Sequence, residues 1–101
     1  MVSKIKLITR TFTTDSIGQS IPMPITTDII ADVSSISQSE FMQAGQIGLK
    51  PEYQFRIWEQ EYGGQRQVEY EDKVYSVYRT YRAKDGRVEL YTEERTGEND
   101  T

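Results

Sequence analysis

The sequence predicts an all-β protein, a small six-stranded β-barrel or barrel-like sandwich with one short helix in the connection between the second and third strands. Three observations lead to this prediction. Apolar and polar residues alternate along much of the chain with the period of two that is typical of half-buried strands. Turn-forming residues separate these runs at close intervals. The alternation of strands and helices that characterises a parallel sheet does not occur.

One domain is expected, because 101 residues are enough for one hydrophobic core and too few for two. We expect this domain to cover residues 1–95, followed by a flexible acidic tail at residues 96–101. Without cysteine, the chain has neither disulfides nor thiol chemistry. No run approaches the roughly 20 apolar residues of a membrane helix, and Met1–Arg10 lacks the apolar segment of a signal peptide. We therefore expect a protein of the cell interior with no membrane partner.

The first two strands are expected to form a long hairpin. Lys4–Thr13 alternates as a strand with one better-buried face, and Asp15–Ser20 supplies turn-forming residues. Pro22 and Pro24 cannot donate hydrogen bonds to a central ladder. The return strand is therefore expected to be interrupted at these prolines, which indicate either an edge or an irregular entry, with regular pairing resuming near Ile25 in a strand over Ile25–Ile36.

A short helix is expected after the second strand. Ser37 and Glu40 have the S-x-x-E spacing of a capping box, which marks the start of a helix. Gly45 is expected to end the helix, and Pro51 lies just beyond it. The connection Ser37–Pro51 is therefore predicted to contain the one helical segment of the chain, followed by a flexible stretch.

From Glu52 to Arg95 the chain is predicted to be a meander of short strands joined by three successive hairpins. Gly63-Gly64 and Asp85-Gly86 have the backbone freedom that tight reversals need. Closure of these strands into a barrel would leave no exposed strand edge. The predicted strands are Glu52–Tyr62, Gln67–Tyr70, Val74–Arg82 and Arg87–Thr92.

The composition argues against most kinds of catalysis. The chain has no histidine, the commonest general base and transition-metal ligand. Neither a Walker A motif nor a dinucleotide-binding glycine motif occurs. Two carboxylate pairs could in principle act as acid and base or bind a cation: Glu59 with Glu61 on one face of the third strand, and Asp28 with Asp32 on the second. Ordinary solvent exposure explains both pairs better. We therefore predict neither an enzyme nor a bound cofactor or metal.

Tyrosine is concentrated in the second half of the chain, which holds all seven, and the run Tyr78-Arg79-Thr80-Tyr81-Arg82 interleaves tyrosine with arginine. Such a run is typical of cross-strand packing in which arginine stems cover a sheet. It is also typical of a protein interface or of a platform that stacks single-stranded bases. The net charge of −4 argues against a broad basic surface for nucleic acid, which makes the last interpretation the weakest.

Several segments together resemble the head-tail connector proteins of long-tailed bacteriophages, the head-completion or stopper group. Their order and spacing carry the resemblance, which covers nearly the whole chain. The segments are Asp15-Ser16-Ile17-Gly18-Gln19, Ile30 to Ile36 leading into Ser39-Glu40-Phe41, Ala44-Gly45 through Gly48 to Glu52, Tyr75 to Tyr81, and Glu89-Leu90-Tyr91 ahead of Gly97.

The resemblance implies a small β-barrel, monomeric when free, that assembles as a homo-oligomeric ring beneath the portal after genome packaging. The ring would close the DNA-filled head, with a portal or adaptor protein above it, a tail or tail-completion protein below it, and packaged DNA passing through it. The implied location is the head-tail interface of the virion, and the host cytoplasm during assembly, for an active phage or a resident prophage.

The resemblance also implies that the segment between the second and third strands, Ser37–Pro51, reaches the channel. Candidate plug residues are Glu40, Phe41, Ile47 and Leu49. Candidate ring-interface residues are Tyr78, Arg79, Tyr81 and Arg82. Three alternatives remain: an adaptor or tail-completion protein of the same connector, a single-stranded nucleic-acid-binding barrel, and an enzyme with carboxylate chemistry.

Overall fold

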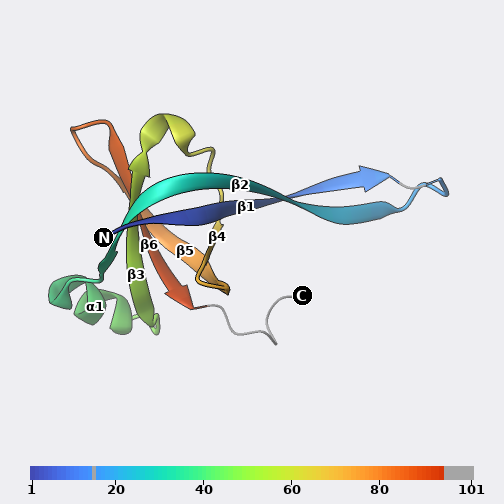
Figure 1. The fold of residues 1–101 in the computed structure, drawn as a ribbon. Helices are drawn as coiled ribbons and strands as arrows, with labels where there is room; N and C mark the ends of the chain where they lie inside the picture. The colour runs from blue at the N-terminus through green and yellow to red at the C-terminus, as the bar shows by residue number, and fades with distance from the viewer. Residues whose placement is uncertain (15, 95–101) are drawn as a thin grey trace.

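Six antiparallel strands close into a barrel in the order β1-β2-β3-β6-β5-β4 in the computed structural model (Figure 1). The structure describes residues 1–14 and 16–94, with only the backbone described at residues 10–13. This confirms the predicted all-β barrel with one short α-helix between the second and third strands. The predicted tail at residues 96–101, and Arg95 at the end of the predicted meander, lie outside the described residues. The elements are β1 (Val2–Thr14), β2 (Ser20–Ser35), α1 (Gln38–Gly45), β3 (Pro51–Trp58), the 3₁₀ helix η1 (Glu59–Glu61), β4 (Gln67–Tyr70), β5 (Lys73–Arg82) and β6 (Arg87–Glu94).

Inward-facing side chains fill the interior of the barrel. Phe55 of β3 is completely buried, and its ring meets the edge of Tyr70, with 5.5 Å between the centroids. Tyr53 makes similar edge contacts with Tyr70 and Tyr75, at 5.3 and 5.5 Å. A small barrel whose interior is packed in this way has no room for a ligand inside it. Any binding surface therefore lies on its outside.

β1 and β2 are longer than the barrel. Their pairing is continuous from Val2↔Asp32 to Thr14↔Ser20, whereas β4 pairs with β1 only at Lys6–Ile8 and β3 pairs with β2 only at Asp32–Ser35. The outer part, Thr9–Thr14 with Ser20–Ile25, is therefore a two-stranded ribbon that projects from the barrel (Figure 1). We call this ribbon the arm.

The arm corrects the expected interruption of the second strand at the prolines and confirms the alternative that they lie at a strand edge. Pro22 pairs with Phe12 and Pro24 with Arg10 in an unbroken register. A two-stranded ribbon tolerates both prolines, because alternate residues direct their N–H toward the unpaired outer edge, where a missing donor removes no ladder bond. Regular pairing thus begins at Ser20 and not near Ile25.

The connectivity after Pro51 also differs from the predicted meander of three hairpins. β3 pairs with β2 and β6, and β4 pairs with β1 and β5. β3 and β4 therefore lie on opposite sides of the barrel, and Gly63-Gly64 belongs to a crossing connection, not to a hairpin turn. β3 ends at Trp58 and the chain continues as η1, a second helical segment that the sequence had not indicated. Glu59 and Glu61 consequently do not share a strand face.

A β-bulge interrupts the predicted alternation of β5. Val77 pairs with Thr92 and Arg79 with Tyr91, which leaves Tyr78 as the extra residue. Tyr75 and Val77 face the core before the bulge. Arg79 lies on the outer face after it, opposite Tyr91. The bulge thus directs two consecutive residues, Tyr78 and Arg79, toward the outside of the barrel.

Candidate functional site

The helix α1 begins where the capping sequence predicts. The Ser37 hydroxyl oxygen accepts a hydrogen bond of 3.2 Å from the backbone N–H of Glu40, and the helix ends at Gly45. The chain then turns back, and the N–H of Leu49 donates to the carbonyl of Ala44 at 3.1 Å. Gly48 makes this turn possible with a φ of +87°, a region that glycine adopts without strain. The predicted helix over the first part of the connection is confirmed.

The Glu40 carboxylate does not complete the capping box. It lies against the barrel, where the Tyr78 hydroxyl donates to its Oε2 at 2.9 Å and Arg79 donates from Nη2 to Oε1 at 2.5 Å and from Nε to Oε2 at 3.3 Å. A buried carboxylate that accepts a two-pronged bond from a guanidinium makes one of the stronger polar contacts available to a protein. This Glu40 contact fastens α1 to the bulge of β5.

The charges of this contact are mutually stabilised. The hydrogen bonds from Arg79 lower the pKa of Glu40, against the opposing effect of burial. Burial and the bond to the carboxylate raise the pKa of the Tyr78 hydroxyl. Glu40 and Arg79 therefore stay charged, and Tyr78 stays a hydrogen-bond donor, at neutral pH. None of the three is poised to exchange protons near neutrality.

Side chains from β3 and β5 cover the outer face of β6 beside the Glu40 contact. The Arg79 guanidinium lies 4.2 Å from the centre of the Tyr91 ring. The Tyr91 hydroxyl donates to Glu89 at 2.6 Å, and Arg56 donates to the same carboxylate at 2.9 Å. Burial, followed by the bond to Glu89, raises the pKa of Tyr91 to about 12. In the run Tyr78-Arg79-Thr80-Tyr81-Arg82, these contacts fit the interpretation of sheet-covering packing for Tyr78 and Arg79, but not for the exposed Tyr81 and Arg82.

A shallow groove of about 250 Å³ lies between α1 with its following turn and β5. It brings together residues that the sequence analysis had placed in two separate sets, the plug candidates and the ring-interface candidates. Those that line it are Glu40, Ile47, Leu49, Tyr78 and Arg79.

The other candidates lie elsewhere. Phe41 is on the outer side of α1, with 54% of its surface exposed. Tyr81 is also exposed, and Arg82 pairs with Glu59 across 3.1 Å at the surface. Sequence reasoning did not single out Arg56, Glu89 and Tyr91 as partners of these residues. The strand pattern carried no signal for them, because all three face outward, and Glu89 and Tyr91 are buried by neighbouring side chains on the outer face.

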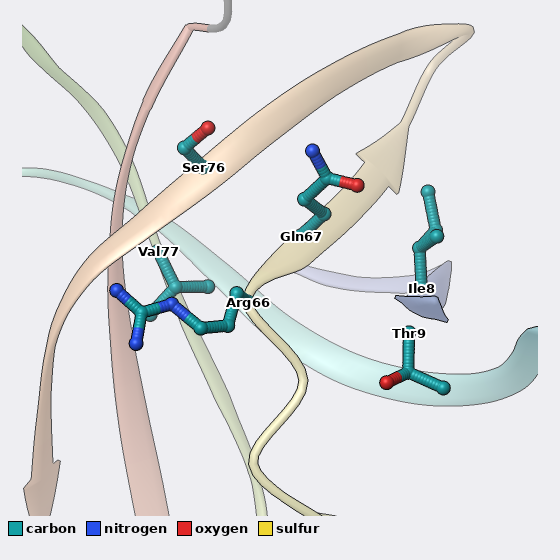
Figure 2. Close-up of a pocket in the computed structure, with 6 residues that line it drawn as sticks. All are labelled: Ile8, Thr9, Arg66, Gln67, Ser76 and Val77. Atoms are coloured by element: carbon teal, nitrogen blue, oxygen red, sulfur yellow. The ribbon is translucent and has the colours of Figure 1, made fainter. Parts of the chain in front are cut away.

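A second hollow is an open notch of about 460 Å³ at the end of the barrel (Figure 2). It lies where β4 begins at Gln67 while β1 continues past it through Ile8 and Thr9. Figure 2 shows Arg66 beside Val77 of β5, and the Val77 N–H donates to the Arg66 carbonyl at 2.9 Å. Arg66 is the one ionisable residue among the residues that line the notch. The notch therefore holds no pair of groups for acid-base chemistry.

The carboxylate pairs considered from the sequence do not form a site in the described part of the chain. Asp28 and Asp32 are both exposed on β2, and Asp32 accepts a bond of 3.0 Å from the amino group of Met1. No group of three or more His, Cys, Asp or Glu residues gathers among the described residues as a metal site would require. None of the described helices is long and apolar enough to cross a membrane.

The groove thus lies on the outside of the barrel, beside a helix that displays apolar side chains. Comparisons of the chain with protein-family models, with curated proteins and with solved structures found no match. The resemblance to phage connector proteins consequently rests on the sequence segments that carry it.

Proposed function

We propose that this protein is a structural component of a bacteriophage head-to-tail connector, which assembles as a ring under the portal, closes the DNA-filled head and docks the tail. One observation carries the proposal beyond the resemblance. A barrel with a filled interior holds the segment between β2 and β3 on its outside and presents it in a defined position through the Glu40 contact. A plug must be held in this way if it is to block a channel reproducibly.

The chemistry of the presented segment suits a channel that contains DNA. Residues 41–49 include no charged side chain, and the chain as a whole carries a net charge of −4. A lumen without many cations does not grip phosphates, because binding to the DNA backbone depends on cationic contacts. Phe41, Met42 and Ile47 are exposed on this segment and supply an apolar surface for contact with a neighbouring copy.

In this proposal the arginine-tyrosine run has two roles. Tyr78 and Arg79 orient the plug segment through Glu40. Tyr81 and Arg82 are exposed and are available to a neighbouring copy in the ring. Ring neighbours make heterologous contacts that can be weak singly and secure when many close together.

The burial of the tyrosines weighs against the alternative of a nucleic-acid-binding barrel. Base stacking needs accessible rings. Of the seven tyrosines, all of which lie in the described residues, Tyr81 is the one that is more than half exposed. A titration with single-stranded DNA at low salt tests this alternative, and we expect no binding that depends on Tyr81.

The proposal is tested with DNA-filled heads that carry their portal. Purified protein should protect the packaged genome from an added nuclease, and heads that lose DNA equally with and without the protein would refute the stopper role. A variant with Gly45–Lys50 shortened should fold but protect less. The matched control shortens the connection between β5 and β6 at Ala83–Gly86, which lies outside the proposed plug. A protein that acts on isolated tails and leaves the genome of DNA-filled heads unprotected would be a tail-completion protein instead.

A further inference from the structure

The arm carries an apolar stripe that nothing in the described structure covers. Ile21, Met23 and Ile25 are 43, 51 and 47% exposed. Because side chains alternate between the faces of a strand, these three residues lie on the same face of β2 as three buried core residues. The core residues are Ile29, Ala31 and Val33. The core-facing stripe of β2 therefore continues into solvent beyond the barrel.

The edge of the arm is a poor site for adding another strand on the β2 side. Pro22 and Pro24 remove two N–H donors from this strand, and proline at an edge is a common device against strand addition. A partner is therefore expected to meet the apolar face of the arm and not its β2 edge.

A surface of matching chemistry lies at the other end of the molecule. Phe41 and Met42 on α1, and Ile47 in the following turn, are 54, 59 and 78% exposed. Figure 1 shows the arm and α1 at opposite ends of the molecule, whose longest dimension is 50 Å. The two surfaces of one copy therefore cannot meet each other, but they can meet between copies.

The distribution of charge favours contact between these two surfaces. Residues 16–27 and 41–49 are the two longest uncharged stretches of a chain in which 28% of residues are charged and the net charge is −4. Copies of such a chain repel each other in general, and this repulsion is least where uncharged surfaces approach. Burying a charge against an apolar partner would add a desolvation cost, which is avoided here on both sides.

We propose that the apolar face of the arm, formed by Ile21, Met23 and Ile25, docks on the exposed apolar face of α1 and its following turn, formed by Phe41, Met42 and Ile47, in a second copy of this chain. The contact joins two different surfaces, so its repetition builds a ring or an open filament and not a closed dimer. This inference rests on the proposed function for its ring context. In that ring, each plug segment is held from one side by its own Glu40 and from the other by the arm of its neighbour.

The size of the surfaces agrees with a protein that is monomeric when free. The three arm side chains offer on the order of 300 Å² of exposed surface, well below the roughly 800 Å² per partner of a standard stable interface. A single contact is therefore weak. Closure of a ring makes the last contacts intramolecular, which raises the stability of the assembly without any new kind of contact.

Cysteine cross-linking tests the contact directly, because the chain has no cysteine of its own. Met23→Cys and Met42→Cys variants are mixed at high concentration with a short bifunctional maleimide. We expect cross-linked dimers in the mixture and not with either variant alone. Lys84→Cys, mixed with Met23→Cys, is the control for random collision. Cross-linking of Met23→Cys alone would show that arms pair with arms, and a mixture no more reactive than the control would also overturn the proposal.

Introducing a charge on one surface, and then an opposite charge on the other, supplies a second test. Met23→Glu should lower cross-linking between an arm cysteine at Ile25→Cys and Met42→Cys by about tenfold or more, since an unpaired charge would be buried. Placing Phe41→Lys in the acceptor should restore it. Cross-linking without protection of DNA-filled heads would leave the contact standing and refute the stopper role. Protection of the heads without cross-linking would support the stopper role and refute the contact between the arm and α1.

Discussion

Glu40 takes part in both a local helix cap and a contact with residues distant in the sequence. Its backbone N–H completes the local cap with Ser37, while its carboxylate bonds to Tyr78 and Arg79, which are 38 and 39 residues away in the chain. The bulge at Tyr78 makes this possible, because it turns two consecutive side chains of β5 outward. The helix is therefore attached by a polar contact and not by a large apolar face.

The Glu40 contact predicts a particular dependence of stability on pH. Because Arg79 lowers the pKa of Glu40 in the folded protein below its ordinary value of 4.5, ionised Glu40 stabilises the fold above that ordinary value. This stabilisation is lost as pH falls through the lowered pKa. Glu40→Gln should cost about 1–3 kcal/mol of unfolding free energy at pH 7, and its difference from the parent should shrink below pH 4.5. Urea unfolding between pH 7 and pH 3 measures both quantities.

The control for this prediction is Glu59→Gln. Glu59 also pairs with an arginine, Arg82, but both side chains are solvent-exposed. Exposed pairs contribute about 0–1 kcal/mol, so this change should have little effect on the free energy of unfolding at pH 7. Equal losses in the two variants would contradict the special position of Glu40.

The turn between β4 and β5 predicts a stabilising substitution. Glu71 and Asp72 have φ values of 52° and 66°, a backbone conformation that residues other than glycine and asparagine adopt at an energetic cost. Glu71→Asn combined with Asp72→Gly should relieve this strain and stabilise the protein by about 1 kcal/mol. The midpoint of thermal unfolding should rise by roughly 4–8 °C for a domain of this size.

The opposite change at the turn between β5 and β6 serves as its control. Gly86 has a φ of +83°, so Gly86→Ala should lower the thermal midpoint by introducing strain of the same kind. Its added methyl group would lie 3.8 Å from the Trp58 ring, an ordinary contact. A fall in stability would therefore report the backbone and not a clash. No change at either turn would show that both backbones relax freely.

At the scale of whole elements, α1 and the arm are both attached to the barrel without belonging to its core. Of the residues of α1, Glu40 and Ala44 are buried. The arm strands pair with each other beyond Thr9 and Ile25, whereas the barrel core of β1 and β2 begins at Leu7 and Ile29. Two-stranded ribbons are at best marginally stable alone in water, so the barrel supports the arm and not the reverse.

Removal of the arm should therefore spare the barrel. Replacing residues 10–24 with Asn-Gly joins Thr9 to Ile25, which already pair, through a two-residue turn of a favoured type. We expect the free energy of unfolding to change by less than about 1 kcal/mol, because all core side chains remain. Cross-linking between Ile25→Cys in this variant and Met42→Cys should disappear, because Ile21 and Met23 have been removed. Urea unfolding measures the first effect, and loss of cooperative unfolding would show that the arm is part of the folding unit.

At the scale of the whole molecule, the barrel is unevenly built around its circumference. β4 closes it with three residue pairs to β1 and four to β5, whereas β6 is flanked by long neighbours and has five consecutive buried residues. Such differences in burial and pairing divide a structure into regions of different local stability.

Hydrogen exchange should reveal this order. Amides of the arm are expected to exchange fastest, those of β4 at intermediate rates, and those of β3 and β6 slowest, near the rate of global unfolding. Exchange followed by mass spectrometry or NMR at neutral pH provides the measurement. Arm amides as slow as those of β6 would contradict this order and would suggest that copies had already associated, a point that dilution would decide.

The sequence by itself determined the all-β class, the single short α-helix with its Ser37 cap, the place of the turn at Gly86, and the position of most strands. Each of these depends on residues close together in the chain, such as a period of two, a capping spacing or a glycine with positive φ. Only the tertiary structure decided that β3 pairs with β6, that the register passes through Pro22 and Pro24 into an arm, and that Glu40 meets Arg79. Strand partners and bulges depend on burial against residues distant in sequence. A local pattern shows that a face is buried but does not specify which distant strand buries it. For this reason the candidate plug and ring residues could be named from the sequence, while their meeting in one groove emerged only from the fold.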